Sequence, residues 1–155
     1  MDDETCHVTC IEAMFINATI VSSITGWPIQ TLADYVTAAD STETAGEGLP
    51  PDTLIDCRNS ADFEFRGLSA GCNSWQMTSD SMAAIIASKL GTTQLILLKS
   101  IPPQESGGLE QLAKSGFVDD LFPRFAKELD FIQFGFPNAS DFALSVPYKT
   151  ESKES

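Results

Sequence analysis

The residues best suited to chemistry are Thr78, Ser79 and Asp80, which come just before a run of apolar residues at helical spacing. All three residue types favour the amino-terminal cap of a helix. Backbone N–H groups and the helix dipole gather negative charge at such an end, which suits a phosphate or a carboxylate that organises lysines around one. Asp80 is therefore a candidate functional side chain, although a role as a simple helix cap is also open.

The helix and strand that follow would position this site. Apolar residues recur at helical spacing from Met82 to Leu90, and Gly91 is typical of the position just after a helix. Gln94–Leu98 is short and uniformly apolar, which predicts an interior strand of a parallel sheet. Open α/β sheets bind ligands beyond the carboxyl ends of their strands, so we expect Lys99 to point toward a ligand edge together with the serine that follows it.

Composition limits the class of protein. At 155 residues and 43% hydrophobic content, the chain fits one ordinary globular domain. A net charge of −13 argues against nucleic acid and anionic membrane surfaces, although helix termini, lysines and a divalent metal can still neutralise a nucleotide locally. We note no apolar run near the roughly 18 residues that span a bilayer, no signal peptide and no disulfide framework among the cysteines. We therefore expect a cytoplasmic protein with no membrane or nucleic-acid partner.

Cys6, His7 and Cys10 form the one cluster that resembles a metal site. Zinc requires four ligands, usually as spaced pairs, and Cys57 and Cys72 are isolated from each other and from this cluster. Cys10 would also fall on or beside the buried face of its helix, where free cysteines are common. We therefore predict no metal site.

The remaining segments alternate between helices and strands. We expect a long amphipathic helix over residues 2 to about 24, with a buried stripe of Ile11, Met14, Phe15, Ala18 and Val21. Further elements are a short helix or strand over 31–36, a strand over 53–57, helices over 109–115 and 123–129, and a strand over 131–136. This order predicts an α/β layered sheet in one domain over residues 1–147, followed by a disordered polar tail over 148–155.

Four motifs resemble the amino acid kinase superfamily, which includes aspartate, glutamate and uridylate kinases. Trp75-x-x-Thr-Ser-Asp-Ser with its helix, and Leu95-Ile-Leu-Leu-Lys-Ser, are similar to the second half of that domain. Asp2-Asp-Glu-Thr-x-His and Ile11-Glu-Ala-Met resemble a mid-domain helix of its small kinases of methanofuran-type cofactor synthesis and their bacterial relatives. The match covers residues 2 to about 25 and 70 to about 135.

The resemblance implies a layered α/β/α sandwich with a mainly parallel sheet that lacks its N-terminal strands. It implies phosphoryl transfer from ATP, with Mg²⁺, to a small-molecule acceptor. Asp80 would organise the phosphate-binding lysines, and Arg124 would replace a family lysine that stabilises the transferring phosphate. The residues facing the acceptor would be Thr78 and Ser79, and those meeting the nucleotide would be Leu98, Lys99, Ser100 and Ile101. Homo-oligomerisation is compatible with this class, with the helix of residues 1–24 as the candidate surface.

The sequence departs from the family pattern at the phosphate cradle. The family opens with Lys-x-Gly-Gly-Ser and has a second glycine-rich turn, whereas this sequence has neither, and Asp119-Asp120 occupies a position usually held by glycines. Two interpretations follow. The chain is a truncated form of a kinase that is inactive alone, or it is a non-catalytic remnant that binds a ligand or partner.

Overall fold

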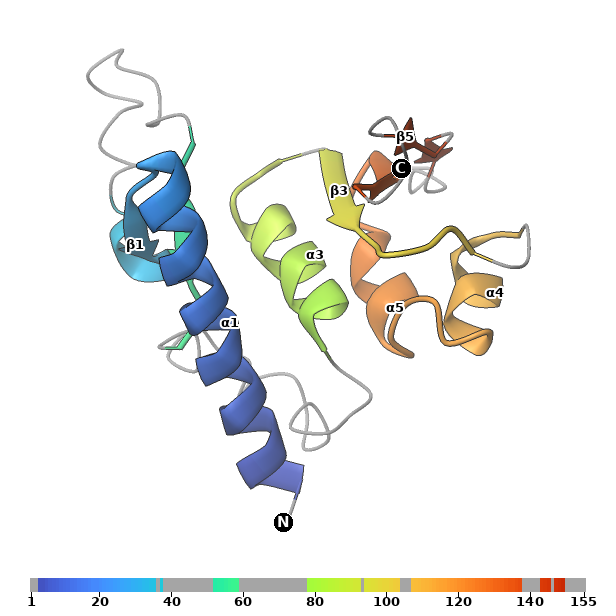
Figure 1. Cartoon of the computed structure of the whole chain (residues 1–155). Helices are drawn as coiled ribbons and strands as arrows, with labels where there is room; N and C mark the ends of the chain where they lie inside the picture. Colours follow the sequence, from blue (N-terminus) through green and yellow to red (C-terminus); the bar gives the residue numbers. More distant parts are fainter. Residues whose placement is uncertain are drawn as a thin grey trace. The chain divides into compact units, whose positions relative to one another are not determined.

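The chain forms two compact units, Met1–Ser74 and Trp75–Ser155, in the computed structural model. The structure describes residues 3–35, 37, 52–58, 78–92, 94–103, 107–137, 143–145 and 147–149. Both units combine helices with short strands, and each contains one parallel strand pair (Figure 1). The chain is therefore mixed α/β, as the order of elements predicted, and the buried core cluster of the described residues lies in the second unit.

The first unit is a long helix packed on a two-stranded parallel sheet. Helix α1 (Asp3–Thr25) ends at Gly26, whose φ of 76° lies in the left-handed region that favours glycine. Strand β1 (Ile29–Thr31) then pairs with β2 (Leu54–Asp56), with Ile29 opposite Leu54. Residues 32–35 are helical, and Leu32 is buried.

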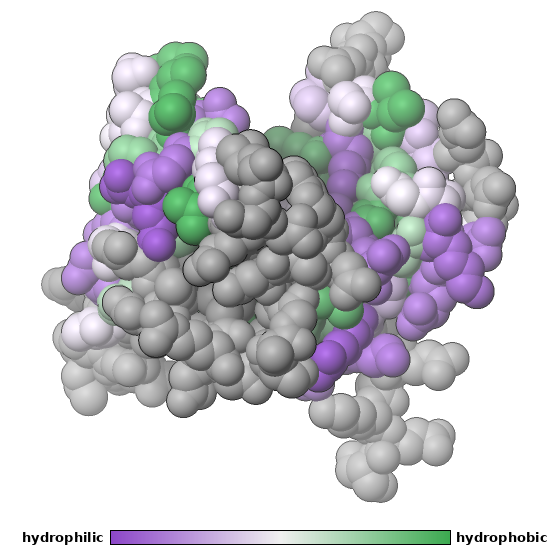
Figure 2. Space-filling view, turned by 90° about the horizontal axis from the view of Figure 1, so that it is seen from below, coloured by the Kyte–Doolittle hydropathy of each residue, from purple (hydrophilic) through white to green (hydrophobic). Residues whose placement is uncertain are grey.

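Helix α1 is apolar on both sides rather than amphipathic. Four residues of the predicted stripe, Ile11, Met14, Phe15 and Ala18, are only half-buried, and Val21 is exposed. The opposite side carries exposed isoleucines at positions 16, 20 and 24. Hydrophobic side chains accordingly reach the surface on the left of Figure 2, the side on which Figure 1 places α1.

The prediction that the chain has no apolar segment near the roughly 18 residues needed to cross a bilayer was wrong. Within α1, the 18 residues Val8–Thr25 are long and apolar enough to cross a membrane by length and composition, and none of them is buried. The scattered Ser and Thr residues hide this run from a count of consecutive apolar residues.

The second unit is a mixed sheet with helices packed on it. Its helices are α3 (Ser79–Lys89), α4 (Leu109–Lys114) and α5 (Phe122–Ala126). Strands β3 (Gln94–Leu98) and β4 (Phe131–Phe136) are parallel, with Gln94 opposite Phe131. Strands β5 (Ala143–Leu144) and β6 (Tyr148–Lys149) both run antiparallel to β4. Parallel pairing is thus confirmed for β3 and β4, whereas the later strands make this sheet mixed.

The core of the second unit lies between the helices and one face of the sheet. Its fully buried large side chains are Leu112, Phe122, Leu129, Ile132 and Phe134. Strand β3 is at the edge of the described sheet: Leu97 faces the core, whereas Ile96 and Leu98 are 44% and 65% exposed. The prediction of an interior strand was therefore wrong, because a uniformly apolar run does not distinguish two covered faces from one.

The predicted disordered tail begins too early. Tyr148 and Lys149 form β6, opposite Ile132 and Phe131. The ring of Phe134 makes edge-to-face contacts with Phe117 and Tyr148, at centroid distances of 4.9 and 5.5 Å. These contacts explain why a short polar segment is held as a strand. Residues 150–155 lie outside the described residues.

Candidate functional site

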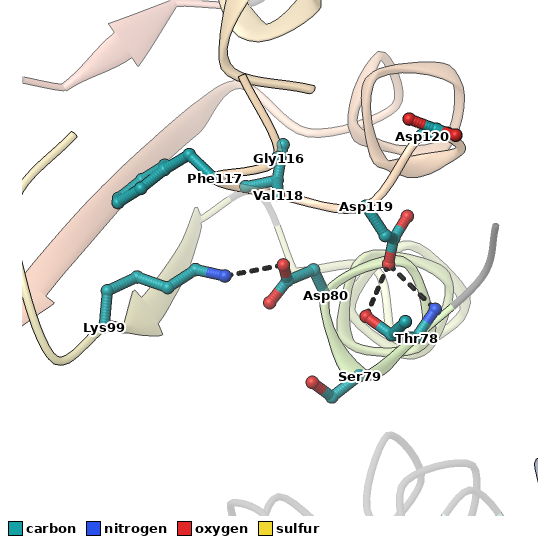
Figure 3. Close-up of a pocket in the computed structure, with 9 residues that line it drawn as sticks. All are labelled: Thr78, Ser79, Asp80, Lys99, Gly116, Phe117, Val118, Asp119 and Asp120. Carbon is teal, nitrogen blue, oxygen red and sulfur yellow. Dashed lines mark hydrogen bonds and ion pairs between the residues drawn. The ribbon is translucent and has the colours of Figure 1, made fainter. Parts of the chain in front are cut away.

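A pocket of about 390 Å³ opens at the amino-terminal end of α3 (Figure 3). Three segments of the second unit surround it: the first turn of α3, the residue after β3, and the loop that leads to α5. Thr78, Ser79, Asp80 and Lys99 are the predicted residues that the structure brings together here. The remaining lining residues are Gly116, Phe117, Val118, Asp119 and Asp120.

Asp80 and Lys99 form an ion pair at the centre of this pocket. Lys99 Nζ lies 2.6 Å from Asp80 Oδ2, and their side chains are only 19% and 12% exposed. Lys99 is fixed at the end of β3, where its backbone N–H donates to the carbonyl oxygen of Gly135. Its ammonium group also lies 5.4 Å from the centroid of the Phe117 ring. A lysine beside the turn aspartate is the arrangement that the family resemblance implies.

Asp119 occupies the amino-terminal end of α3. Its Oδ2 accepts hydrogen bonds from the N–H and hydroxyl of Thr78, at 2.9 and 3.0 Å, and from the N–H of Ser81 at 2.9 Å. Its Oδ1 accepts the Ser81 hydroxyl and the N–H of Phe122, the latter at 2.8 Å. Thr78 itself makes no side-chain capping hydrogen bond. One carboxylate therefore caps α3 from a distance and α5 locally.

The carboxylate of Asp119 stands at the helix end that we described as suited to a phosphate or a carboxylate. It meets the partial positive charge of the helix end as an internal anion. In the sequence, Asp119 stands out only as a departure from the glycines of the amino acid kinase pattern. An Asp three residues before Phe122-Pro123 is a recognisable signal for the start of α5, but its contact with Thr78 has no local signal.

The structure leaves four predicted site residues outside the lining of this pocket. Arg124 is exposed on α5, and its guanidinium lies 5.5 Å from the ring centroid of its neighbour Phe125. Leu98 and Ile101 are 65% and 61% exposed, and Ser100 is also exposed. Of the four residues assigned to the nucleotide, only Lys99 reaches the pocket.

The lining of the pocket is acidic. It contains three carboxylates, those of Asp80, Asp119 and Asp120, and one ammonium group, that of Lys99, so its side chains carry a formal excess of two negative charges. Figure 3 shows Asp120 beyond Asp119, on the side away from the ion pair. Such a lining repels free anions and attracts cations.

Among the described residues of this pocket, the groups that could bind a triphosphate are already paired, and no cluster of metal ligands is present. In the part of the chain that the structure describes, no group of three His, Cys, Asp or Glu residues could hold a metal ion. The ammonium group in the lining is already paired with Asp80, and the helix end already binds Asp119.

The side chains of Cys6 and His7 lie outside the described residues. Cys10 is exposed rather than buried, which corrects its predicted position.

A second polar cluster lies in the first unit, at the end of β2. Arg58 donates from Nε and Nη2 to the buried carboxylate of Asp56, with Nη2 2.8 Å from Oδ2. These bonds lower the pKa of Asp56 below its ordinary value and raise that of Arg58. Between them, Cys57 is half-buried, and burial together with the Asp56 charge raises the pKa of its thiol. The arrangement is that of a structural anchor, because its charges are satisfied by each other.

Comparisons with protein-family models, curated protein sequences and solved structures give no match. The resemblance to amino acid kinases therefore rests on the sequence motifs alone.

Proposed function

We propose that the chain is a non-catalytic small-molecule-binding module, whose ligand enters the pocket at the amino end of α3 with a positively charged group. The observation that supports this proposal is the charge of the lining, which contains three carboxylates and a single lysine that is already paired with one of them. A volume of about 390 Å³ lies in the range of small-molecule sites, and Phe117 and Val118 add apolar surface. An organic amine or guanidinium compound fits this combination of charge and size.

Titration of the full chain, followed by NMR amide shifts, tests this proposal. The probes are putrescine and agmatine, with succinate and glycerol phosphate as anions of similar size. We expect saturable shifts at residues 78–80 and 116–120 with the amines only. Asp120→Asn should weaken amine binding about threefold, the effect of one exposed charge. Asp130→Asn is the matched control, because Asp130 is exposed and outside the pocket lining.

Two results would overturn this proposal. One is saturable binding of the anions with no response to the amines, which would show that the net charge of the lining does not select the ligand. The other is the absence of a saturable shift with any of the four probes.

A second candidate is the ATP-dependent phosphotransferase of the amino acid kinase type, built as an α/β/α sandwich. The 2.6 Å contact between Asp80 and Lys99 favours it, since the resemblance gives that aspartate the role of ordering a phosphate-binding lysine. The described residues do not fit a triphosphate, so this function would require a phosphate-binding segment beyond them. Incubation with ATP, Mg²⁺ and a panel of small acceptors should give no turnover above a heat-treated control. Turnover by the purified chain would establish this candidate over the first.

A further inference from the structure

The segment Val8–Thr25 of α1 carries apolar residues on both sides, with Glu12 and Asn17 as its strongly polar residues, and none of its 18 residues is buried by the part of the chain that the structure describes. Half-buried residues such as Met14 and Phe15 line one side, and Ile16, Ile20 and Ile24 are 60%, 52% and 78% exposed on the other. A helix that is hydrophobic on all sides belongs either in a protein core or in a membrane. None of these 18 residues is buried, so the described residues do not provide a protein core for this helix.

The dimensions of this segment match a bilayer. At a rise of 1.5 Å per residue, its 18 residues extend about 27 Å, close to the roughly 30 Å of a hydrocarbon core. Its one charged residue, Glu12, lies near the amino-terminal end, and the segment contains no Lys, Arg or His. Trp27 follows just beyond the helix and is 39% exposed, in the position of an interfacial aromatic residue.

The hydroxyl groups of the segment supply a second, independent observation. All of its Ser and Thr side chains donate to backbone carbonyl oxygens: Thr9 to Thr5, Thr19 to Phe15, Ser22 to Trp27, Ser23 to Ile20 and Thr25 to Val21. Hydrocarbon offers no hydrogen-bond partners, so polar groups inside it must be satisfied within the protein. These bonds satisfy the hydroxyl groups of the segment, so that Glu12 and Asn17 are the polar side chains that insertion into lipid still has to accommodate.

We propose that residues 8–25 of α1 span a lipid bilayer. Insertion would exchange the contacts of α1 with β1 and β2 for lipid. The Arg58 guanidinium lies 3.2 Å from the Phe15 ring centroid and 3.8 Å from Glu12, but the ion-pair side chains are 34% and 56% exposed. Contacts of that exposure hold a helix weakly. This proposal is independent of the pocket in the second unit, and it replaces the expectation of a protein without a membrane partner.

The test is cell-free synthesis of the full chain in the presence of phosphatidylcholine vesicles, followed by flotation and extraction at alkaline pH. We expect the chain to float and to resist extraction. Ile16→Lys places a charge at the centre of the segment and should lower the resistant fraction about tenfold. Val8→Lys is the matched control, since Val8 is also exposed, at 54%, but lies at the end of the segment, where a lysine can reach the interface. Circular dichroism without lipid checks that both variants fold.

Each alternative occupant of this surface gives a distinct result that overturns the proposal. A chain that floats but is released by alkali binds at the membrane surface only. A dimer in lipid-free buffer that Ile16→Lys converts to a monomer shows that the exposed isoleucines pair two copies. Removal of residues 1–25 by signal peptidase in microsomes identifies the segment as a leader. A monomer that ignores vesicles has no membrane segment.

Discussion

Asp119 Oδ2 accepts two hydrogen bonds from Thr78, although 41 residues separate them in the sequence, at 2.9 Å from the backbone nitrogen and 3.0 Å from the hydroxyl. The same carboxylate binds the first N–H of α5. The side chain of Asp119 therefore caps both α3 and α5, and it holds together two of the segments that line the pocket. A ligand at this site would meet a helix end that is already neutralised.

Replacing Asp119 with alanine should destabilise the second unit by about 2–3 kcal/mol. The change removes the cap of two helices, and a lost cap typically costs about 1 kcal/mol, with more for bonds to a charged group. Urea denaturation measures the loss. Asp120→Ala, at an exposed neighbouring position, should change the free energy of unfolding by less than about 0.5 kcal/mol. Equal effects of the two substitutions would contradict the capping role.

The ion pair between Asp80 and Lys99 should be strongly coupled. Because both side chains are mostly buried, Lys99→Met should cost about 1–3 kcal/mol, between the values for exposed and buried pairs. The double variant with Asp80→Asn should cost less than the sum of the two single variants, with a coupling of about 1 kcal/mol. Lys114→Met, at an exposed lysine, is the control. Additive effects would show that the two groups are neighbours without a stabilising interaction.

Sequence patterns predicted the local parts of this site and missed the long-range part. The limits of β3 and β4 were confirmed because each is a short, mainly apolar run, ended by Lys99 in one case and by Pro137 in the other. The start of α3 was confirmed because Thr78 and its neighbours carry a clear capping signal. Asp119 could not be assigned to that helix, since nothing near it in sequence indicates a partner 41 residues away.

Acid should weaken the anchor at the end of β2. Arg58 lowers the pKa of Asp56 from 3.8, so the folded state gains stability above that value and loses it as the pH falls through the lower folded value. We expect the stability difference between the wild type and Asp56→Asn to be constant near neutral pH and to shrink below about pH 4. Unfolding curves at a series of pH values measure it. In an Arg58→Gln background, Asp56→Asn should show a much smaller pH dependence; an unchanged one would exclude Arg58 as the cause.

Cys10 should react with iodoacetamide about tenfold faster than Cys57 at neutral pH, because the thiolate is the reactive form and access controls its encounter with the reagent. Cys10 is exposed, whereas burial and the Asp56 charge raise the pKa of the half-buried Cys57. Peptide mapping by mass spectrometry follows both sites in one sample. Denaturation in urea is the control and should equalise the rates, and a faster reaction at Cys57 in the folded chain would contradict this order.

Longer-range features of the fold explain the other differences between prediction and structure. The predicted stripe of α1 is half-buried as far as Ala18 and exposed at Val21, because helical spacing alone does not show how much of a helix its neighbours cover. The β6 strand has no sequence signal of its own, because Tyr148 is held by the ring of Phe134 in another strand. In both cases the contacts that determine burial or pairing are made with residues distant in the sequence, which local patterns do not reveal.

The order of strands in the second unit has a consequence for synthesis. Strand β3 pairs with one edge of β4, and the other edge is shared by β5 and β6, which come later in the chain. While the chain leaves the ribosome, β3 and β4 can pair first, but the second edge of β4 waits for Lys149. During that interval its unpaired N–H and C=O groups can join a strand of another nascent chain. Two strands of two residues each therefore close the second edge of β4 to pairing with another chain.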